Sequence, residues 1–400
     1  MSADRRSFLG GLALLASAGA AAQTPFKPDD PAAPFFPPKE RFPLWPGKPP
    51  GARAKPIVPD WTMNNPPPNS ELWLRGINMP EVHVYRPARS DGSSLLVLPG
   101  GGYGFLSVQN EGLDPAERFN AERTTVFMLT YRLPGEGWSN RSVVALQDAQ
   151  RAMRLIRSRA AEFKIDQARL GVLGFSAGGH LAADLAVSHA EQVYKPIDAA
   201  DSQSARPAFA GLVYPVITMD THFSEGSSQP NLFGDHPEPA LIAARSPALH
   251  VTGDTPPSFV VAAFDDGLIH IDNSLIWIDS CRKAKVLVEA HLLAEGGHGF
   301  GLHLPPDNPG SRWPDLFALW MRKHGGRGLS PAPSVRAWRT ASGRTWTECQ
   351  SIRRRRRPSM RRMRLRWLAP GSRSCACPSW PTTPTRCSSR TRRCCWASMP

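Results

Sequence analysis

The stretch LGVLGFSAGGHLAADLAV, residues 170–187, decides the fold. Its first six residues form an apolar run typical of a buried strand, and its last nine place apolar side chains at helical spacing. Only the residues around Ser176 remain to turn the strand into a helix. Glycines stand two positions before and two positions after this serine, at Gly174 and Gly178. The stretch therefore predicts a sharp strand-to-helix turn that presents Ser176.

The five residues from Gly174 to Gly178 match the G-x-S-x-G pattern of a nucleophile elbow. A serine displayed for attack needs a strained turn, and the flanks of such a turn are too crowded for side chains. The same turn leaves the first amides of the helix without partners, so that they can face an anion. An ordinary turn between a strand and a helix is the alternative interpretation.

A second glycine-rich element, LPGGGY at residues 98–103, follows another apolar run. Glycine lets several backbone amides converge on one point, as an oxyanion hole requires. We expect the donors to be the amides of Gly101, Gly102 and Ala177. A phosphate-binding loop is the rival interpretation, but neither G-x-G-x-x-G nor a following Gly-Lys-Ser/Thr is present. A simple turn is a further alternative.

A serine nucleophile needs a base, and the base needs a carboxylate to orient it. His298 lies in the glycine-flanked segment EGGHGF, just after the last predicted strand. Asp265 and Asp266 both end the predicted strand at residues 258–264, and either could orient the base. No pair of histidines has the spacing of a metal site such as H-E-x-x-H. We therefore expect a Ser-His-Asp site with no metal and no cofactor.

Strand and helix signals alternate from residue 81 to residue 323. Continuous apolar strands separated by helices predict an α/β fold, a mainly parallel sheet with helices on both faces. The active site of such a sheet lies at the carboxyl ends of its strands. The main predicted strands are 95–98, 125–131, 170–175, 209–214, 258–264 and 291–293, and the predicted helices are 145–156, 179–187 and 313–323.

The N-terminal part of the chain predicts export. Arg5 and Arg6 precede an apolar run, and a small-residue cleavage signature ends at Ala22, so residues 1–22 resemble a twin-arginine signal. An ordinary secretory signal or a membrane anchor is the alternative, although the run is short for a bilayer. Residues 23–70 are rich in proline, which predicts an extended lead-in. Residues 71–325 then form the catalytic domain.

Residues 326–400 differ from the rest of the chain. They carry 18 Arg, no Lys, one acidic residue and six of the seven cysteines. The formal charge of the whole chain is +14, so a tail of +17 leaves −3 for the other residues, and we expect no nucleic-acid partner for the catalytic domain. The tail could bind polyanions or be a disordered extension. We favour a third interpretation, a GC-rich gene translated out of frame.

Residues 44–323 resemble the α/β-hydrolase superfamily, and most closely the exported bacterial esterases known as acetyl-xylan esterases or xylanase-associated lipases. The resemblance is specific because many motifs occur together. They are LWPG (44–47), VYRPA (84–88), LPGGGY (98–103), EG (111–112), YRLP (131–134), LQDAQRAMRLIRSRA (146–160), GFSAGGHLA (174–182), TPPSF (255–259), DNSL (272–275) and GGHGFGL (296–302).

The resemblance implies a serine esterase that hydrolyses short-chain acyl esters, above all acetyl esters, on plant-derived oligosaccharides. It implies that the second aspartate of the pair, Asp266, orients His298. His270 stands where the family has a proline, which changes the acid-loop side of the pocket. A periplasmic or secreted protein, with no membrane partner beyond its export signal, fits such a substrate.

Two other functions use the same features. A peptidase of the prolyl-oligopeptidase type would have the same order of Ser176, Asp266 and His298, although residues 25–80 are too few for its usual gating domain. A non-catalytic polyanion-binding protein would act through the arginine-rich tail. Only the second of these alternatives predicts that replacing Ser176 changes nothing.

Overall fold

The computed structural model describes residues 24–25, 36–64, 71–223 and 226–324. The chain divides into two units, residues 1–331 and 332–400, and all described residues belong to the first. The predicted export signal and the arginine-rich tail lie outside the described residues. No helix in the described part of the chain is long and apolar enough to cross a membrane.

An eight-stranded sheet forms the centre of the first unit, in the order β12-β11-β10-β9-β6-β8-β5-β2. The strands from β12 to β8 run parallel, and β5 and β2 pair antiparallel at one end. The predicted mainly parallel sheet is therefore confirmed. The strands are β2 (Arg41–Pro43), β5 (Glu81–Tyr85), β6 (Ser94–Leu98), β8 (Thr125–Thr130), β9 (Leu170–Phe175), β10 (Ala210–Val213), β11 (Ser258–Ala263) and β12 (Val288–Leu293).

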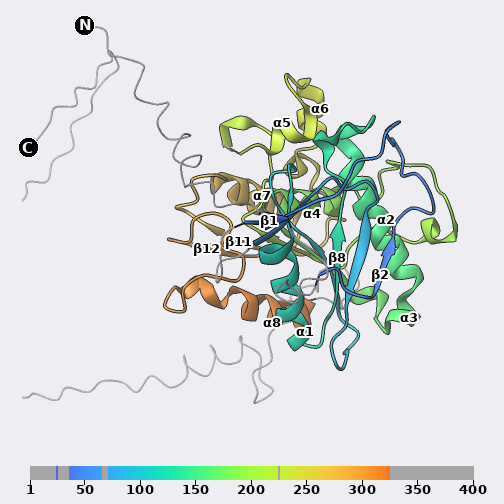
Figure 1. Cartoon of the computed structure of the whole chain (residues 1–400). Coiled ribbons are helices and arrows are strands. Elements are labelled where there is room, and N and C mark those ends of the chain that lie inside the picture. Colours follow the sequence, from blue (N-terminus) through green and yellow to red (C-terminus); the bar gives the residue numbers. More distant parts are fainter. Residues whose placement is uncertain (1–23, 26–35, 65–70, 224–225, 325–400) are drawn as a thin grey trace, which may run out of the picture. The chain divides into compact units, whose positions relative to one another are not determined.

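Helices cover both faces of this sheet, as predicted (Figure 1). Side chains of α2, α4 and α7 pack on one face, and those of α1 and α8 pack on the other. Each helix hides apolar strand residues that would otherwise be exposed. The helices are α1 (Asp114–Ala121), α2 (Val144–Ser158), α3 (Ala160–Phe163), α4 (Ser176–Ser188), α5 (Ser228–Phe233), α6 (Pro239–Ala244), α7 (Asp272–Ala284) and α8 (Trp313–His324).

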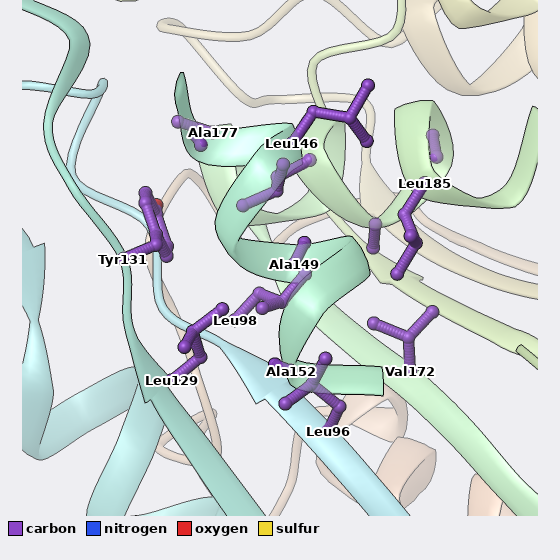
Figure 2. Packing of buried hydrophobic residues seen from close by; sticks show 14 of the residues in the cluster. Leu96, Leu98, Leu129, Tyr131, Leu146, Ala149, Ala152, Val172, Ala177 and Leu185 are labelled. Atoms are coloured by element: carbon purple, nitrogen blue, oxygen red, sulfur yellow. The ribbon is translucent and has the colours of Figure 1, made fainter. Parts of the chain in front are cut away.

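The apolar strands supply two cores because successive side chains point to opposite faces of the sheet. In β6, Leu96 and Leu98 belong to the core under α2 and α4, whereas Leu95 and Val97 belong to the core under α1 and α8. Figure 2 shows the first of these cores, where small side chains such as Ala149 of α2 lie close to the leucines of the sheet. Burial on both faces explains why the strands read as continuous apolar runs rather than alternating patterns.

A second sheet of four antiparallel strands has the order β1-β3-β4-β7 and was not predicted. Its strands are β1 (Thr24–Pro25), β3 (Asp60–Asn64), β4 (Glu71–Arg75) and β7 (Leu106–Ser107). Several of its residues come from the proline-rich segment, which also supplies β2 to the main sheet. The described parts of this segment thus contribute strands and buried side chains to the packed body, whereas the sequence predicted only an extended lead-in up to residue 70.

The proline-rich segment is fixed to the body by a buried polar cluster. Trp45 is 1% exposed, and its Nε1 donates to Asp148 Oδ1 at 2.9 Å. The same carboxylate pairs with the guanidinium of Arg132 at 2.7 Å and accepts the Arg132 amide at 2.9 Å, with both side chains fully buried. Since a buried charge must be paired, the three side chains form one interdependent unit.

Replacing Asp148 with alanine is expected to lower the free energy of unfolding by about 3–5 kcal/mol, because Arg132 would keep a buried charge without an ionic partner. Urea denaturation of the full chain measures this. The matched control is Glu40→Ala, which removes the Glu40–Arg86 pair, whose side chains are 41% and 35% exposed. The control is expected to cost under about 1 kcal/mol. Equal losses in the two variants would contradict this account.

Candidate active site

Ser176 lies at the junction of β9 and α4 in the conformation that its glycine neighbours predict. Its φ of +51° is in the left-handed region, which is unusual for a residue with a side chain. A Cβ on Gly174 would collide with the carbonyl of Gly178, and a Cβ on Gly178 would collide with the carbonyl of Leu98. The flanks of the turn therefore have room only for glycine.

His298 and Asp266 form a hydrogen-bonded chain with Ser176, although the three residues are far apart in the sequence. The Ser176 Oγ lies 2.9 Å from His298 Nε2, and His298 Nδ1 lies 2.7 Å from Asp266 Oδ2. The other oxygen of Asp266 accepts the amides of Leu268 and Ile269 at 2.9 and 2.8 Å. The carboxylate is thus held on both sides, with Asp266 7% and Ser176 6% exposed.

Asp265, the alternative to Asp266, makes different contacts. It is exposed, and its Oδ1 accepts the amides of Gly296 and Gly297, each at 2.8 Å. Those glycines directly precede His298, so Asp265 ties down the loop that carries the histidine without touching the imidazole. The two neighbouring carboxylates therefore serve one loop in two ways.

The glycine-rich loop after β6 reaches the same place. Gly101 and Gly102 have φ values of +119° and +60°, and both line a cavity together with Ser176 and His298. Neither amide donates a hydrogen bond to another described residue. The amide of Ala177 lies in the first turn of α4, where helix geometry leaves amides without an internal partner. All three predicted donors are thus unengaged.

The cavity above Ser176 measures about 370 Å³, within the range of small-molecule sites. Its lining comes from the antiparallel sheet, the glycine-rich loop, the π-helical turn Gln109–Leu113, the start of α4, the segment that leads into α5, and the loops that follow β11 and β12. The lining residues are Glu71, Trp73, Gly101, Gly102, Phe105, Ser107, Asn110, Glu111, Ser176, Gly226, Ser227, Ser228, Leu268, Ile269, His298 and Gly299.

Two buried residues at this site were not predicted to belong to it. Glu111, 4% exposed, accepts the Gly100 amide at 2.6 Å and the Tyr214 hydroxyl at 2.8 Å. Burial raises the pKa of Glu111 to about 7, and those hydrogen bonds oppose the rise. Tyr214, with a φ of +36°, packs its ring 4.9 Å from the ring of His298. The only signal in the sequence was the Glu-Gly motif at 111–112, which assigns no role.

His180, one turn beyond Ser176, has a structural role. It is buried and lies between the Tyr103 hydroxyl, at 2.7 Å, and the carbonyl of Arg245, at 2.8 Å. Burial lowers the pKa of its imidazole, so this histidine is neutral. Its contacts join the start of α4 to the glycine-rich loop.

The chain is similar to one family model and to several known proteins, two of which are named as an acetylxylan esterase and a xylanase. The BD-FAE family model matches residues 82–279. An acetylxylan esterase of Xylanibacter ruminicola is 30% identical over 61% of this chain and 45% of the relative, and endo-1,4-beta-xylanase B of Butyrivibrio fibrisolvens is 31% identical over 51% of this chain and 32% of the relative. The chain thus spans less than half the length of these curated relatives.

A solved structure is similar over a larger part of the chain. The acetyl ester-xyloside bifunctional hydrolase of Caldicellulosiruptor lactoaceticus aligns with a TM-score of 0.59 and 29% identity. The alignment covers 74% of this chain and 100% of that one. The residues that match the family model, 82–279, include Ser176 and Asp266 but end before His298.

Proposed function

We propose that this chain, an α/β-hydrolase that resembles acetylxylan esterases, hydrolyses carboxylic esters through Ser176, His298 and Asp266. The observation that carries the proposal is the unbroken hydrogen-bonded chain from Ser176 Oγ through the imidazole to Asp266, beside unengaged amides. This arrangement has the parts that acyl transfer to serine requires: a nucleophile, a base, a group that orients the base, and donors for an oxyanion.

In the first half of the proposed reaction, Ser176 Oγ attacks the ester carbonyl while His298 Nε2 takes the hydroxyl proton. The carbonyl oxygen becomes an oxyanion, and the amides of Gly101, Gly102 and Ala177 stabilise it. Asp266 keeps Nδ1 protonated and stabilises the imidazolium that forms. The imidazolium then gives its proton to the departing alcohol, and the acyl group stays on Ser176 as an ester.

In the second half, a water molecule attacks the acyl group and gives one proton to His298. The new oxyanion forms in the same place. His298 returns the proton to Ser176 Oγ as the carbon–oxygen bond breaks, which releases the carboxylic acid. Gly297 and Gly299 have positive φ values, +63° and +73°, which shape the loop that carries His298. This loop holds the imidazole within reach of the Ser176 hydroxyl and of the departing alcohol.

The proposed substrates are acetyl and other short-chain acyl esters of plant-derived oligosaccharides. The names of the relatives support this choice, and so does the cavity. Trp73 and Phe105 stack at 3.9 Å on its wall, and Glu71 lies beside them. Aromatic faces and a carboxylate suit a sugar, which has apolar faces and hydroxyl donors. Export to the periplasm, where such oligosaccharides would be met, is part of this proposal.

Acetate release from acetylated xylo-oligosaccharides is the experiment that tests the proposal. We expect the full chain to release acetate and to hydrolyse a short-chain synthetic ester at least about 10-fold more efficiently than an octanoyl ester. The reason is the size of the cavity, because about 370 Å³ is near the lower end of the range of small-molecule sites and leaves less room for a long acyl chain than for an acetyl group. Release of long acyl chains in preference to acetate would overturn the acetyl assignment.

A further inference from the structure

Glu111 is an uncompensated carboxylate in the wall of the catalytic cavity. It lies on the π-helical turn Gln109–Leu113, just before α1, and is 4% exposed. No Lys or Arg among the described residues forms an ion pair with it. Keeping such a group buried costs free energy, and groups of this kind concentrate at functional sites. The proposed reaction above gives Glu111 no part.

Its two oxygens connect the loops on either side of Ser176. Oε2 accepts the amide of Gly100, the first glycine of the loop that carries the expected oxyanion donors. Gly100 is wedged against the nucleophile, because a Cβ added to it would lie 2.6 Å from Glu111 Oε2 and 2.9 Å from Ser176 Cβ. One side of the carboxylate therefore sets how closely this loop approaches Ser176.

The other oxygen acts on the loop of the base. Oε1 accepts the hydroxyl of Tyr214, and that hydroxyl oxygen in turn accepts the amide of Gly301 at 3.0 Å. Gly301 follows His298 closely, and the Tyr214 ring packs against the imidazole. Through these hydrogen bonds, Tyr214 connects Glu111 to the segment that carries His298.

We propose that Glu111 is a positioning residue for the ester hydrolysis proposed above. As a carboxylate, it holds the glycine-rich loop through Gly100 and, through Tyr214, the loop of His298, so that the oxyanion donors and the base keep one spacing around Ser176. This role rests on the proposed function for its reaction, and on the contacts of Glu111 for its geometry.

The negative charge matters for two reasons. Hydrogen bonds to an ionised acceptor are shorter and stronger than those to a neutral one, and both oxygens of Glu111 accept. The charge also attracts His298 when the imidazole is protonated, which is its state when the oxyanion forms. A neutral residue of the same shape would keep the contacts but lose both effects.

The charge state of Glu111 responds to pH near neutrality. Burial raises its pKa to about 7, the Tyr214 and Gly100 hydrogen bonds and the charge of His298 lower it, and Glu71 raises it. Burial and the charge of Glu111 raise the pKa of the two neighbouring tyrosines, Tyr131 and Tyr214. As the pH falls below about 7, Glu111 gains a proton and one of its oxygens becomes a donor. The ionised form of Glu111 is therefore expected to be the more active one.

The test is Glu111→Gln in the full chain, assayed with 4-nitrophenyl acetate. The glutamine oxygen can accept the Gly100 amide, and its NH₂ group can donate to the Tyr214 oxygen. We expect kcat to fall by about 10-fold, which corresponds to about 1.4 kcal/mol, with KM within about twofold. On the acid side, the slope of log kcat/KM against pH is expected to be steeper in the parent chain than in the variant just below about pH 7, because only the parent chain loses the charge of Glu111 there.

Two further variants separate positioning from general structure. Tyr214→Phe keeps the ring against His298 but removes the hydroxyl, and we expect it to lower kcat by about 10-fold as well. Glu136→Gln is the matched control, because Glu136 also accepts two backbone amides, at 2.5 and 3.2 Å, and burial also raises its pKa. It does not line the cavity, so its kcat and acid-side slope are expected to stay unchanged.

A second readout does not depend on the ester chosen. Diisopropyl fluorophosphate reacts with an activated serine, forming an oxygen–phosphorus bond and releasing fluoride. The rate of modification at Ser176, measured by mass spectrometry, is expected to fall about 10-fold in Glu111→Gln and not in Glu136→Gln.

The possible outcomes are distinct. An unchanged labelling rate and an unchanged slope in Glu111→Gln would overturn the positioning role. If the parent chain is labelled at Ser176 but hydrolyses no acyl ester, the proposed function fails, and the labelling rates alone then decide the role of Glu111. Absence of labelling in the parent chain would overturn both proposals.

Discussion

Replacing Ser176 with alanine is expected to lower kcat for ester hydrolysis by about 10⁶-fold, the largest effect of any single change in this chain. The variant keeps His298 and the oxyanion donors but has no oxygen to accept the acyl group. Alanine has the same Cβ as serine, so the strain of the positive φ at this position stays the same and the fold is expected to persist. Steady-state kinetics with 4-nitrophenyl acetate measure the loss.

The control for this variant is Ser188→Ala. Ser188 is the last residue of α4, the helix that Ser176 begins, and its hydroxyl donates to Asp184 at 3.0 Å. It lies at the opposite end of the helix from the cavity, so kcat is expected to stay within about twofold of the parent chain. If Ser176→Ala kept more than a few per cent of the activity, the nucleophile would be another group and the proposed mechanism would be wrong.

Replacing Asp266 with asparagine is expected to lower kcat by about 10⁴-fold. The amide is close to the carboxylate in shape but carries no charge, and its NH₂ group can hydrogen-bond a bare Nδ1. His298 would then present a protonated Nε2 to Ser176, which cannot accept the hydroxyl proton. The imidazolium formed in the reaction would also lose its stabilising partner. The kcat of the purified variant measures both effects together.

The substitution Asp265→Asn serves as a comparison. It removes a carboxylate that lies near the imidazole, whereas Asp266→Asn removes the carboxylate that contacts the imidazole. Asp265 accepts two amides of the loop but does not contact His298, so its loss is expected to lower kcat by less than about 10-fold. Equal effects of the two substitutions would mean that the loop, rather than the imidazole, depends on these carboxylates. A larger effect at Asp265 would reverse the assignment.

Local sequence was sufficient for the features whose physical cause is local. The turn at Ser176 needs glycine at Gly174 and Gly178 because carbonyl groups fill the space that a Cβ would occupy. The core strands are apolar runs in the sequence because helices cover both faces of the sheet. These runs alternate along the chain with segments of helical spacing, which predicted the α/β fold. The elements predicted at 95–98, 145–156, 170–175 and 313–323 are confirmed within a few residues.

The proline-rich segment shows where local signals failed. Prolines predict an extended chain, and that part of the expectation agrees with the strands found there. They do not predict whether an extended chain packs, and Trp45 is buried because Asp148, more than a hundred residues later, accepts its indole N–H. The second sheet escaped prediction for the same reason, since its strands are short and their partners are remote.

The sequence by itself determined the fold class, the serine, the glycine-rich loop and the histidine, because each has a signature within a few neighbouring residues. The residues alone left Asp265 and Asp266 open, the family resemblance favoured Asp266, and the tertiary structure brings Asp266 to His298. Only the tertiary structure showed that Glu111 and Tyr214 join the site. Asp265 and Asp266 share one local context, and their contacts differ only because successive residues after β11 point in different directions. The role of a buried carboxylate depends on which loops the fold brings to its oxygens, and no short pattern records that.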